Sequence, residues 1–328
     1  MESMQPDFMG ESPFLQEHKK IKKDGNFVGG LLVLLLCTQI LVSAGLLVAA
    51  FFNGWDLKAE NYGLGNTQFV LLNTLGYVLY LVVPAAVVAL CSRRRAVAFP
   101  AKKVNGGLFA VCVLGGMALA VLSNVVTGWL MVMMESVGIP LPQFSEMVEK
   151  TAVSLLLNII STALIPAFVE EWIFRGFVFG TLRAHGDGVA VVLSAALFGL
   201  FHENLVQIPF AFLLGLVFAY LVVLTDSIWP SVVLHGANNL MSVLLSFVGL
   251  YVSAEKANTV TLTVFLTVAA FGVAALLPAL LHHKRVIKPI GNGLSLFTSK
   301  ERAAKLLTAP LLLIAVVGMV ILTGVSLR

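Results

Sequence analysis

Charged side chains are scarce in this 328-residue chain. Only 12% of the residues are Asp, Glu, Lys or Arg, whereas 59% are hydrophobic. Soluble globular domains are about half apolar and about a quarter charged, so the composition excludes a soluble enzyme and a nucleic-acid-binding protein. Apolar runs of about 18 residues or more are long enough to cross the hydrocarbon core of a bilayer. The composition therefore predicts an all-α fold, a polytopic membrane helical bundle in the lipid bilayer, with no nucleic-acid partner.

Cysteine is also scarce. Cys37, Cys91 and Cys112 lie far apart, in or beside apolar runs, and form no CxxC motif. This spacing supports neither a disulfide framework nor a cysteine metal site. We predict that the three thiols are small lipid-facing or packed side chains.

Several catalytic signatures are missing as well. The sequence has no Gly-x-Ser-x-Gly, no P-loop and no GxGxxG before a helix. His202-Glu203 begins like the HExxH helix of zinc peptidases, but Val206 stands where the second histidine is needed. A serine nucleophile elbow, a P-loop phosphate site, a GxGxxG dinucleotide site and an HExxH zinc site are therefore excluded.

Apolar windows predict about eight to nine transmembrane helices. The nine windows are 27–52, 68–92, 106–134, 150–183, 188–203, 205–225, 227–249, 258–281 and 306–325. The first is too long for a signal peptide and lacks a small-residue cleavage pattern after it, so we expect an uncleaved span. A polar tail, 1–26, precedes it, and a polar linker, 284–305, precedes the last window.

Lysine and arginine predict the orientation. With the N-terminus inside, 16 of the 21 Lys and Arg residues fall on the cytoplasmic side and four on the other. This bias follows the positive-inside rule. We therefore expect a multi-pass protein of the plasma (cell) membrane with a cytoplasmic N-terminus.

Ionisable side chains inside the spans are few. They are Glu170, Glu171 and Arg175 in the fourth window, His202 and Glu203 at the end of the fifth, and His235, with Asn239 on the same helix face, in the seventh. Such groups are costly in lipid and usually face a cavity or a partner, so each is a functional candidate. A helix rises 1.5 Å per residue, so the distance of each side chain from the predicted inner end of its helix can be compared: about 20 Å for Glu170, 21 Å for His202, 18 Å for Asn239 and 12 Å for His235. Three helices thus place polar groups in one slab of the membrane, although a single intramembrane histidine can also be a purely structural hydrogen-bonding residue.

The two neighbouring glutamates differ in their predicted surroundings. Glu171 precedes Arg175 by four residues, the favourable order for an ion pair along a helix. Glu170 lies about 100° around the helix and is not paired in that way, so it is suited to act as a general base. A solvated helix end is the alternative. Pro166 frees the carbonyl of Thr162, which predicts a kink just before the carboxylates.

Three motifs in order resemble one known family. They are Glu170-Glu171-x-x-x-Arg175, Phe198-x-x-x-His202 and His235-x-x-x-Asn239, about thirty residues apart. This set resembles the CAAX-protease and bacteriocin-processing (CPBP, or Abi) family of intramembrane proteases. The resemblance covers 148–250, so we expect a protease core there, with N-terminal transmembrane helices in 27–147 and C-terminal transmembrane helices in 251–328.

The resemblance implies roles for these residues. Glu170 would activate water, and His202, His235 and Asn239 would surround the scissile carbonyl and its oxyanion. Glu171, Arg175 and Phe198 would support the site. Glu170, His202 and His235 would also make a His₂Glu set for one zinc or another divalent metal, and a metal-free glutamate mechanism needs the same residues. Both remain open from the sequence, and the cofactor is unknown.

The function predicted from these features is hydrolysis of a peptide bond in a peptide or membrane-protein substrate, by a glutamate-dependent, metallopeptidase-like membrane endopeptidase. Two other classes stay open: a non-catalytic binding or immunity protein that retains the fold, and a proton-coupled transporter. The intact polar set disfavours the first, and the lack of internal repeats disfavours the second. The sequence predicts neither the cleavage site nor the oligomeric state.

Overall fold

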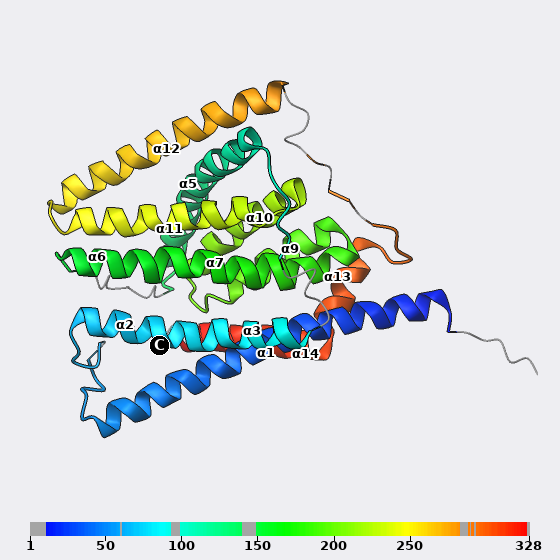
Figure 1. The fold of residues 1–328 in the computed structure, drawn as a ribbon, viewed down its shortest axis with the longest axis horizontal. Coiled ribbons are helices and arrows are strands. Elements are labelled where there is room, and N and C mark those ends of the chain that lie inside the picture. Colours follow the sequence, from blue (N-terminus) through cyan, green and yellow to red (C-terminus); the bar gives the residue numbers. More distant parts are fainter. Residues whose placement is uncertain are drawn as a thin grey trace, which may run out of the picture.

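The computed structural model describes residues 11–59, 61–92, 99–139, 149–282, 288, 290–291 and 293–326. The helices of the N-terminal part are α1 (Pro13–Phe52), α2 (Asn66–Tyr77), η1 (Val78–Val82), α3 (Val83–Cys91) and α5 (Gly106–Ser136). The helices of the C-terminal part are α9 (Asp187–Leu200), α10 (Gln207–Thr225), α11 (Trp229–Gly249), α12 (Ala254–His282), α13 (Ser299–Leu307) and α14 (Pro310–Val325). The predicted all-α membrane bundle is confirmed (Figure 1).

Between the two parts runs one long helix of 34 residues, Ala152–His185, which changes its winding along its length. Its segments are α6 (Ala152–Asn158), η2 (Ile159–Leu164), α7 (Ile165–Glu171), η3 (Trp172–Val178), α8 (Phe179–Leu182) and η4 (Arg183–His185). Segments η2 and η3 are π-helical and flank the carboxylates of α7. Single π-turns inside α-helices occur frequently at functional sites. A kink at Pro166 stays a prediction; what the structure has there is a wider, π-helical turn in η2, just before the proline.

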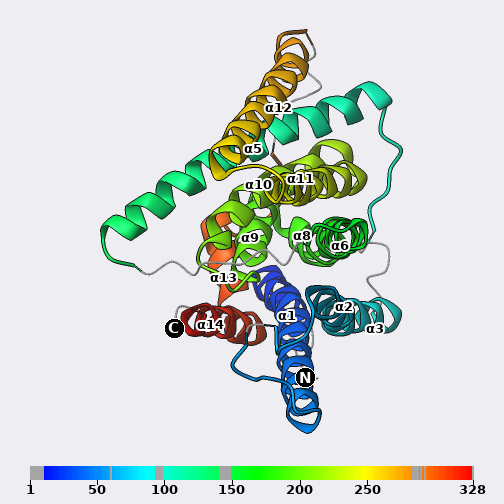
Figure 2. The same ribbon diagram turned by 90° about the vertical axis from the view of Figure 1, so that its left-hand side faces the viewer.

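The bundle is layered around this helix. Viewed end-on, α5 and α12 cross on one side, α10 and α11 lie beneath them, and the long helix and α9 come next (Figure 2). Helices α1, α2, α3 and α14 cover the other side. The long helix packs against α11, and α10 packs against both α9 and α11. The site residues on these helices are therefore held in the middle of the bundle.

The described residues contain close to the eight to nine membrane-spanning helices that the sequence predicts. Among the described residues, seven helices are long and apolar enough to cross a membrane, or eight if α13 and α14, which meet at 74°, form one broken span. The window 188–203 becomes α9, whose 14 residues extend about 21 Å, short of a hydrocarbon core of about 30 Å. The window 306–325 becomes α14, of 16 residues. Hydropathy identified both apolar segments but overestimated the length of their helices.

Two polar segments also differ from the prediction. Helix α1 begins at Pro13, capped by the Ser12 hydroxyl, so much of the predicted tail 1–26 continues the first helix. Within the predicted linker 284–305, helix α13 begins at Ser299 behind a capping box of Thr298 and Glu301. Residues 1–10 and part of 284–292 lie outside the described residues. The three cysteines are unpaired, as predicted; Cys37 and Cys91 are exposed and Cys112 is buried.

Charges gather at the end of the bundle that the lysine and arginine bias predicts to be cytoplasmic. Arg183 bridges Asp187 and Asp226, each at 2.8 Å, and Lys102 also bonds to Asp226, at 3.0 Å. Partial burial disfavours ionisation of the Asp226 carboxyl, but the hydrogen bonds from Lys102 and Arg183 outweigh it and hold its pKa below the usual range. Ion pairs thus connect the long helix to the ends of α9 and α10.

Helices α1 and α14 approach so closely that only glycine fits between them. A Cβ atom on Gly29 would lie 2.0 Å from the backbone nitrogen of Leu312. We predict that Gly29→Ala forces the helices apart and costs roughly 1–3 kcal/mol of stability, which a thermal denaturation curve in detergent would detect. Gly45→Ala is the matched control on the same helix, because its Cβ would meet nothing within 4 Å. Equal melting temperatures for the two variants would contradict this packing.

Candidate active site

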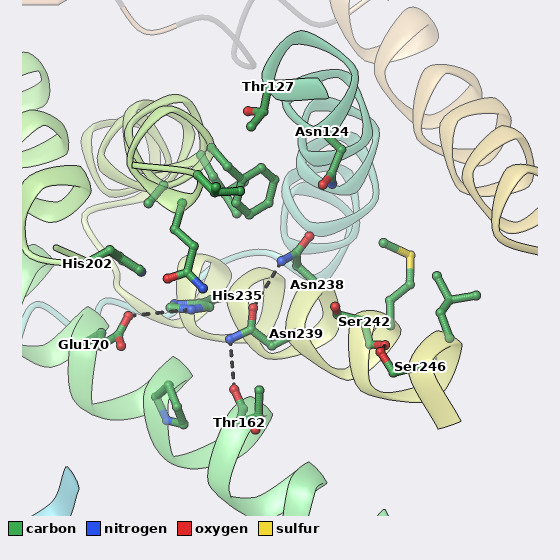
Figure 3. Close-up of a pocket in the computed structure, with 18 of the residues that line it drawn as sticks. Asn124, Thr127, Thr162, Glu170, His202, His235, Asn238, Asn239, Ser242 and Ser246 are labelled. Carbon is green, nitrogen blue, oxygen red and sulfur yellow. Dashed lines mark hydrogen bonds and ion pairs between the residues drawn. The ribbon is translucent and has the colours of Figure 1, made fainter. Parts of the chain in front are cut away.

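The predicted site residues lie around one cavity of about 880 Å³. Helices α5, α7, α9, α10, α11 and α12 all contribute to its lining (Figure 3). The predicted residues among the lining are Glu170, Phe198, His202, His235 and Asn239. Positions that are up to 69 residues apart in the sequence are therefore brought to one place. Glu171 and Arg175 lie directly beside it, fully buried.

Glu170 reaches this cavity from α7. Its side chain is 12% exposed, and its Oε2 lies 3.9 Å from Nε2 of His235. Tyr77 on α2 donates a hydrogen bond of 2.8 Å to Oε1 of Glu170. The carboxylate thus has a hydroxyl partner, which the sequence analysis missed. The signal for it was a tyrosine hydroxyl inside a largely apolar span, which is costly there unless it has a partner.

The ion pair predicted from the four-residue spacing is present. Nη1 of Arg175 lies 3.1 Å from Oε1 of Glu171, and neither side chain is exposed. Arg175 also donates to the carbonyl of Gly215, at 3.3 Å. Its guanidinium carbon lies 4.3 Å from the ring centre of Phe198 and 4.9 Å from that of Phe218. Cation–π contacts strengthen when they are desolvated, so the two rings help to keep this charge inside the bundle.

His235 on α11 is held by the same carboxylate. Its Nδ1 lies 3.1 Å from Oε1 of Glu171, and a carboxylate can only accept, so Nδ1 carries the proton. The imidazole also stacks on Phe218, with ring centres 5.1 Å apart and planes at 22°. Glu171 therefore has two partners, Arg175 and His235, and the bond to the histidine was not predicted. It sets the tautomer of His235 and directs Nε2 toward Glu170.

His202 stands at the turn between α9 and α10. Its Nδ1 donates to the carbonyl of Phe198, at 2.9 Å, and its ring packs edge-on against the Phe198 ring. The four-residue spacing of this motif thus corresponds to a hydrogen bond one turn back along the helix. The next residue, Glu203, has a left-handed backbone with φ of 52°, which helps the chain to reverse into α10. His202 is therefore fixed at the end of a short helix within the bundle.

Asn239 on α11 is tied to the long helix. Its Nδ2 donates to the carbonyl of Thr162, at 3.0 Å, and its Oδ1 accepts from Asn238, at 3.1 Å. Thr162 lies four residues before Pro166, so this carbonyl is the one that the proline leaves without its helical donor. The amide of Asn239 replaces that donor. An amide nitrogen carries two hydrogens, so one N–H is not used in this bond.

The predicted metal set does not fit this arrangement. Within the described residues, no group of three or more His, Cys, Asp or Glu side chains is placed so that it could hold a metal ion. Glu170 and His235 approach to 3.9 Å, and the other ring nitrogen of His235 bonds to Glu171.

Burial of the Glu171–Arg175 ion pair predicts that alanine variants of the two neighbouring glutamates differ in stability. Glu171→Ala leaves the guanidinium of Arg175 uncompensated and fully buried, which costs roughly 3–5 kcal/mol. Glu170→Ala removes a carboxylate at the cavity edge and leaves the pair intact, so we expect a much smaller loss. The melting temperature in detergent and the protein abundance in the membrane measure the stability loss of each variant. The double variant Glu171→Leu/Arg175→Met should recover part of the loss; comparable melting temperatures for the two alanine variants would refute the assignment.

Comparisons with known proteins bear on the central helices. Residues 152–241 match the family model described as type II CAAX prenyl endopeptidase Rce1-like. None of the curated proteins and none of the solved structures matches the chain. The matched segment contains all three motifs and lies within the predicted core 148–250. The match agrees with the resemblance of the three motifs to the CAAX-protease family, over 90 of the 328 residues.

Proposed function

We propose that this protein is an intramembrane endopeptidase in which Glu170 activates a water molecule. The observation that carries the proposal is the pairing of the Glu170 carboxylate with Nε2 of His235 at 3.9 Å, beside one cavity inside a membrane bundle. This separation is too long for a direct hydrogen bond, and it leaves room for one water within hydrogen-bond distance, about 2.8 Å, of both atoms. The substrate is a peptide or a membrane protein.

The reaction then follows general base catalysis. Glu170 takes a proton from the water as its oxygen attacks the scissile carbonyl carbon, and the carbonyl oxygen becomes an oxyanion. The second N–H of Asn239 donates to that oxyanion. Glu170 passes the proton to the amide nitrogen, the C–N bond breaks, and a carboxylic acid and an amine leave.

The remaining residues hold these groups in place. Glu171 fixes the tautomer and orientation of His235 through the bond to Nδ1. The carbonyl of Phe198 does the same for His202, whose Nε2 is not used in that bond and contacts the substrate. Arg175 balances the charge of Glu171. Catalytic geometry must be held closely, so positioning bonds of this kind raise turnover.

The membrane setting belongs to the same proposal. The charge bias supports a cytoplasmic N-terminus in the plasma membrane, with the end of the bundle that carries Lys102 and Arg183 inside. A peptide bond in lipid is screened from water. A polar cavity at membrane depth gives water access to the bond, which hydrolysis requires.

Glu170→Gln tests the base. Glutamine keeps the shape of the side chain and can still accept from Tyr77, but it cannot take a proton from water. We expect an unchanged melting temperature and a loss of turnover of roughly 10²-fold or more. The measurement is a proteomic comparison of membranes from cells with the wild-type protein and the variant, followed by cleavage assays on the polypeptides that accumulate.

Glu203→Gln is the matched control for this experiment. Glu203 follows His202 and, like Glu170, is partly buried, but it accepts from Gln39, at 2.9 Å, and does not line the cavity described above. Its variant should process the same polypeptides as the wild type. Identical membrane proteomes for the wild type and Glu170→Gln would instead favour a non-catalytic scaffold.

Tyr77→Phe tests the positioning of Glu170 from α2. Removal of the hydroxyl leaves Oε1 without its 2.8 Å donor, so the carboxylate becomes less well oriented. We expect kcat to fall about five- to twentyfold and KM to stay the same, because Tyr77 does not line the cavity. Tyr80→Phe, on a ring 5.5 Å from that of Tyr77, is the control and should keep kcat within about twofold. A raised KM with unchanged kcat in Tyr77→Phe would contradict the positioning role.

A further inference from the structure

A second cavity lies between α5, α10 and α12, apart from the candidate active site. Its volume is about 340 Å³, within the range of about 300–1,000 Å³ that is usual for ligand pockets. In the end-on view, α5 and α12 cross and α10 lies beneath them (Figure 2). Of the twelve described residues that line the cavity, only Tyr220 and Cys112 carry a polar side-chain atom. The cavity is therefore almost entirely apolar.

This lining is unsuited to water. A buried water molecule needs about two to four polar partners. The Tyr220 hydroxyl is already bonded to the backbone of Lys288: it accepts from the N–H, at 3.1 Å, and lies 3.4 Å from the carbonyl oxygen, to which it donates. The thiol of Cys112 is only a weak donor. An empty cavity would lose the dispersion contacts of its walls, so an apolar chain is the ligand that this space fits.

The cavity opens to the lipid-facing surface of the bundle. Gly116 and Leu221 lie buried at its floor, whereas Leu119 and Leu280 on its lining are 39% and 47% exposed. Along α5 the cavity extends from Val111 to Leu119, a rise of about 12 Å. One leaflet supplies half of a hydrocarbon core of about 30 Å. The cavity thus has the length and the access that an acyl chain of a neighbouring lipid requires.

One end of the cavity lies beside a basic side chain. Leu224 and Leu280 line the cavity close to the C-terminal ends of α10 and α12. At this end Nζ of Lys288 donates to the carbonyl of Val223, at 2.9 Å, and its backbone bonds to Tyr220 as described above. An ammonium group carries three hydrogens, so the bond to Val223 leaves donors for a ligand. Lys288 therefore lies at the mouth of the cavity.

The charges around this mouth are in excess of their counterions. Lys288, Lys102 and Arg183 share the carboxylate of Asp226, at 3.8, 3.0 and 2.8 Å, and Arg183 also pairs with Asp187. Three cations thus stand against two carboxylates. The side chains of Lys288 and Lys102 are 41% and 73% exposed, so both ammonium groups are accessible. Basic side chains at the edge of the bilayer attract the head groups of anionic lipids.

We propose that the cavity between α5, α10 and α12 is a binding site for an anionic phospholipid, with one acyl chain in the cavity and the phosphate beside Lys288 and Lys102. Burial of the chain contributes to the affinity with each CH₂ group that enters the cavity. The excess positive charge selects the head group. The inference is independent of the proposed endopeptidase function.

Helix α10 separates the lipid site from the candidate active site. Val217 and Tyr220 line the apolar cavity, whereas Leu214 and Phe218 line the other one. Phe218 stacks on the ring of His235. A lipid in the apolar cavity therefore packs against the helix that supports His235 from its opposite face, and it should stabilise the folded protein.

Val111→Phe tests the cavity. The probe is dioleoylphosphatidylglycerol, added to the purified full-length protein in detergent, and Kd is measured by native mass spectrometry. We expect this lipid to raise the melting temperature of the wild type. In Val111→Phe the larger ring occupies part of the cavity, and exclusion of only two CH₂ groups of the acyl chain weakens binding roughly tenfold. Val125→Phe is the matched control, because Val125 is exposed on the same helix and does not line this cavity.

Lys288→Gln tests the head group. Dioleoylphosphatidylcholine has the same chains and no net charge, so the wild type should bind it more weakly than phosphatidylglycerol. Loss of one cation should weaken the binding of phosphatidylglycerol about fivefold and leave that of phosphatidylcholine unchanged. A variant that merely disturbs the fold would lose both lipids alike. Lys300→Gln, which removes an exposed lysine from α13, is the control and should keep both affinities.

The outcomes are distinct for the two parts of the site. Equal affinities of the wild type for phosphatidylglycerol and phosphatidylcholine would overturn the choice of an anionic lipid. An unchanged affinity for phosphatidylglycerol in Val111→Phe would overturn the cavity as the site of the chain. Glu170→Gln should bind the lipid as the wild type does, because Glu170 does not line this cavity; the lipid site can therefore be measured whether or not the protein cleaves a peptide.

Discussion

The buried ion pair of Glu171 and Arg175 is the interaction on which the rest of the site depends. Both charges are fully removed from solvent, at 3.1 Å, so neither can change partner without a large cost in free energy. The same carboxylate bonds to His235, and the guanidinium lies against Phe198, whose carbonyl holds His202. One charge pair thus aligns residues from three helices, and it does so where water cannot compete for its hydrogen bonds.

The site also depends on a helix outside the segment that matches the family model. Tyr77 lies on α2, far before residue 152 in sequence, yet its hydroxyl bonds to the carboxylate of Glu170. The close α1–α14 contact at Gly29 holds the layer in which α1 and α2 lie. The N-terminal helices therefore do more than anchor the protein: they contribute to the geometry of the proposed catalytic base.

Hydropathy and spacing predicted much of the fold and most of the candidate site. Long apolar runs predict spans because a helix must bury about 20 such residues to cross a bilayer. Hydropathy overestimated the length of α9, because an apolar run does not reveal that the chain turns back at His202 and Glu203. The backbone of Glu203 is left-handed at this turn. The i, i+4 spacing of Glu171 and Arg175 predicted their contact, because that contact lies along one helix.

The sequence by itself determined the class of protein, the positions of the apolar segments and the set of polar residues that need partners in lipid, because these follow from composition and local periodicity. Only the tertiary structure decided which partners they have. The bonds of Tyr77 to Glu170, His235 to Glu171 and Asn239 to the carbonyl of Thr162 each join separate helices. Such pairs depend on how helices cross and rotate against one another, and a single sequence contains no local signal for that geometry.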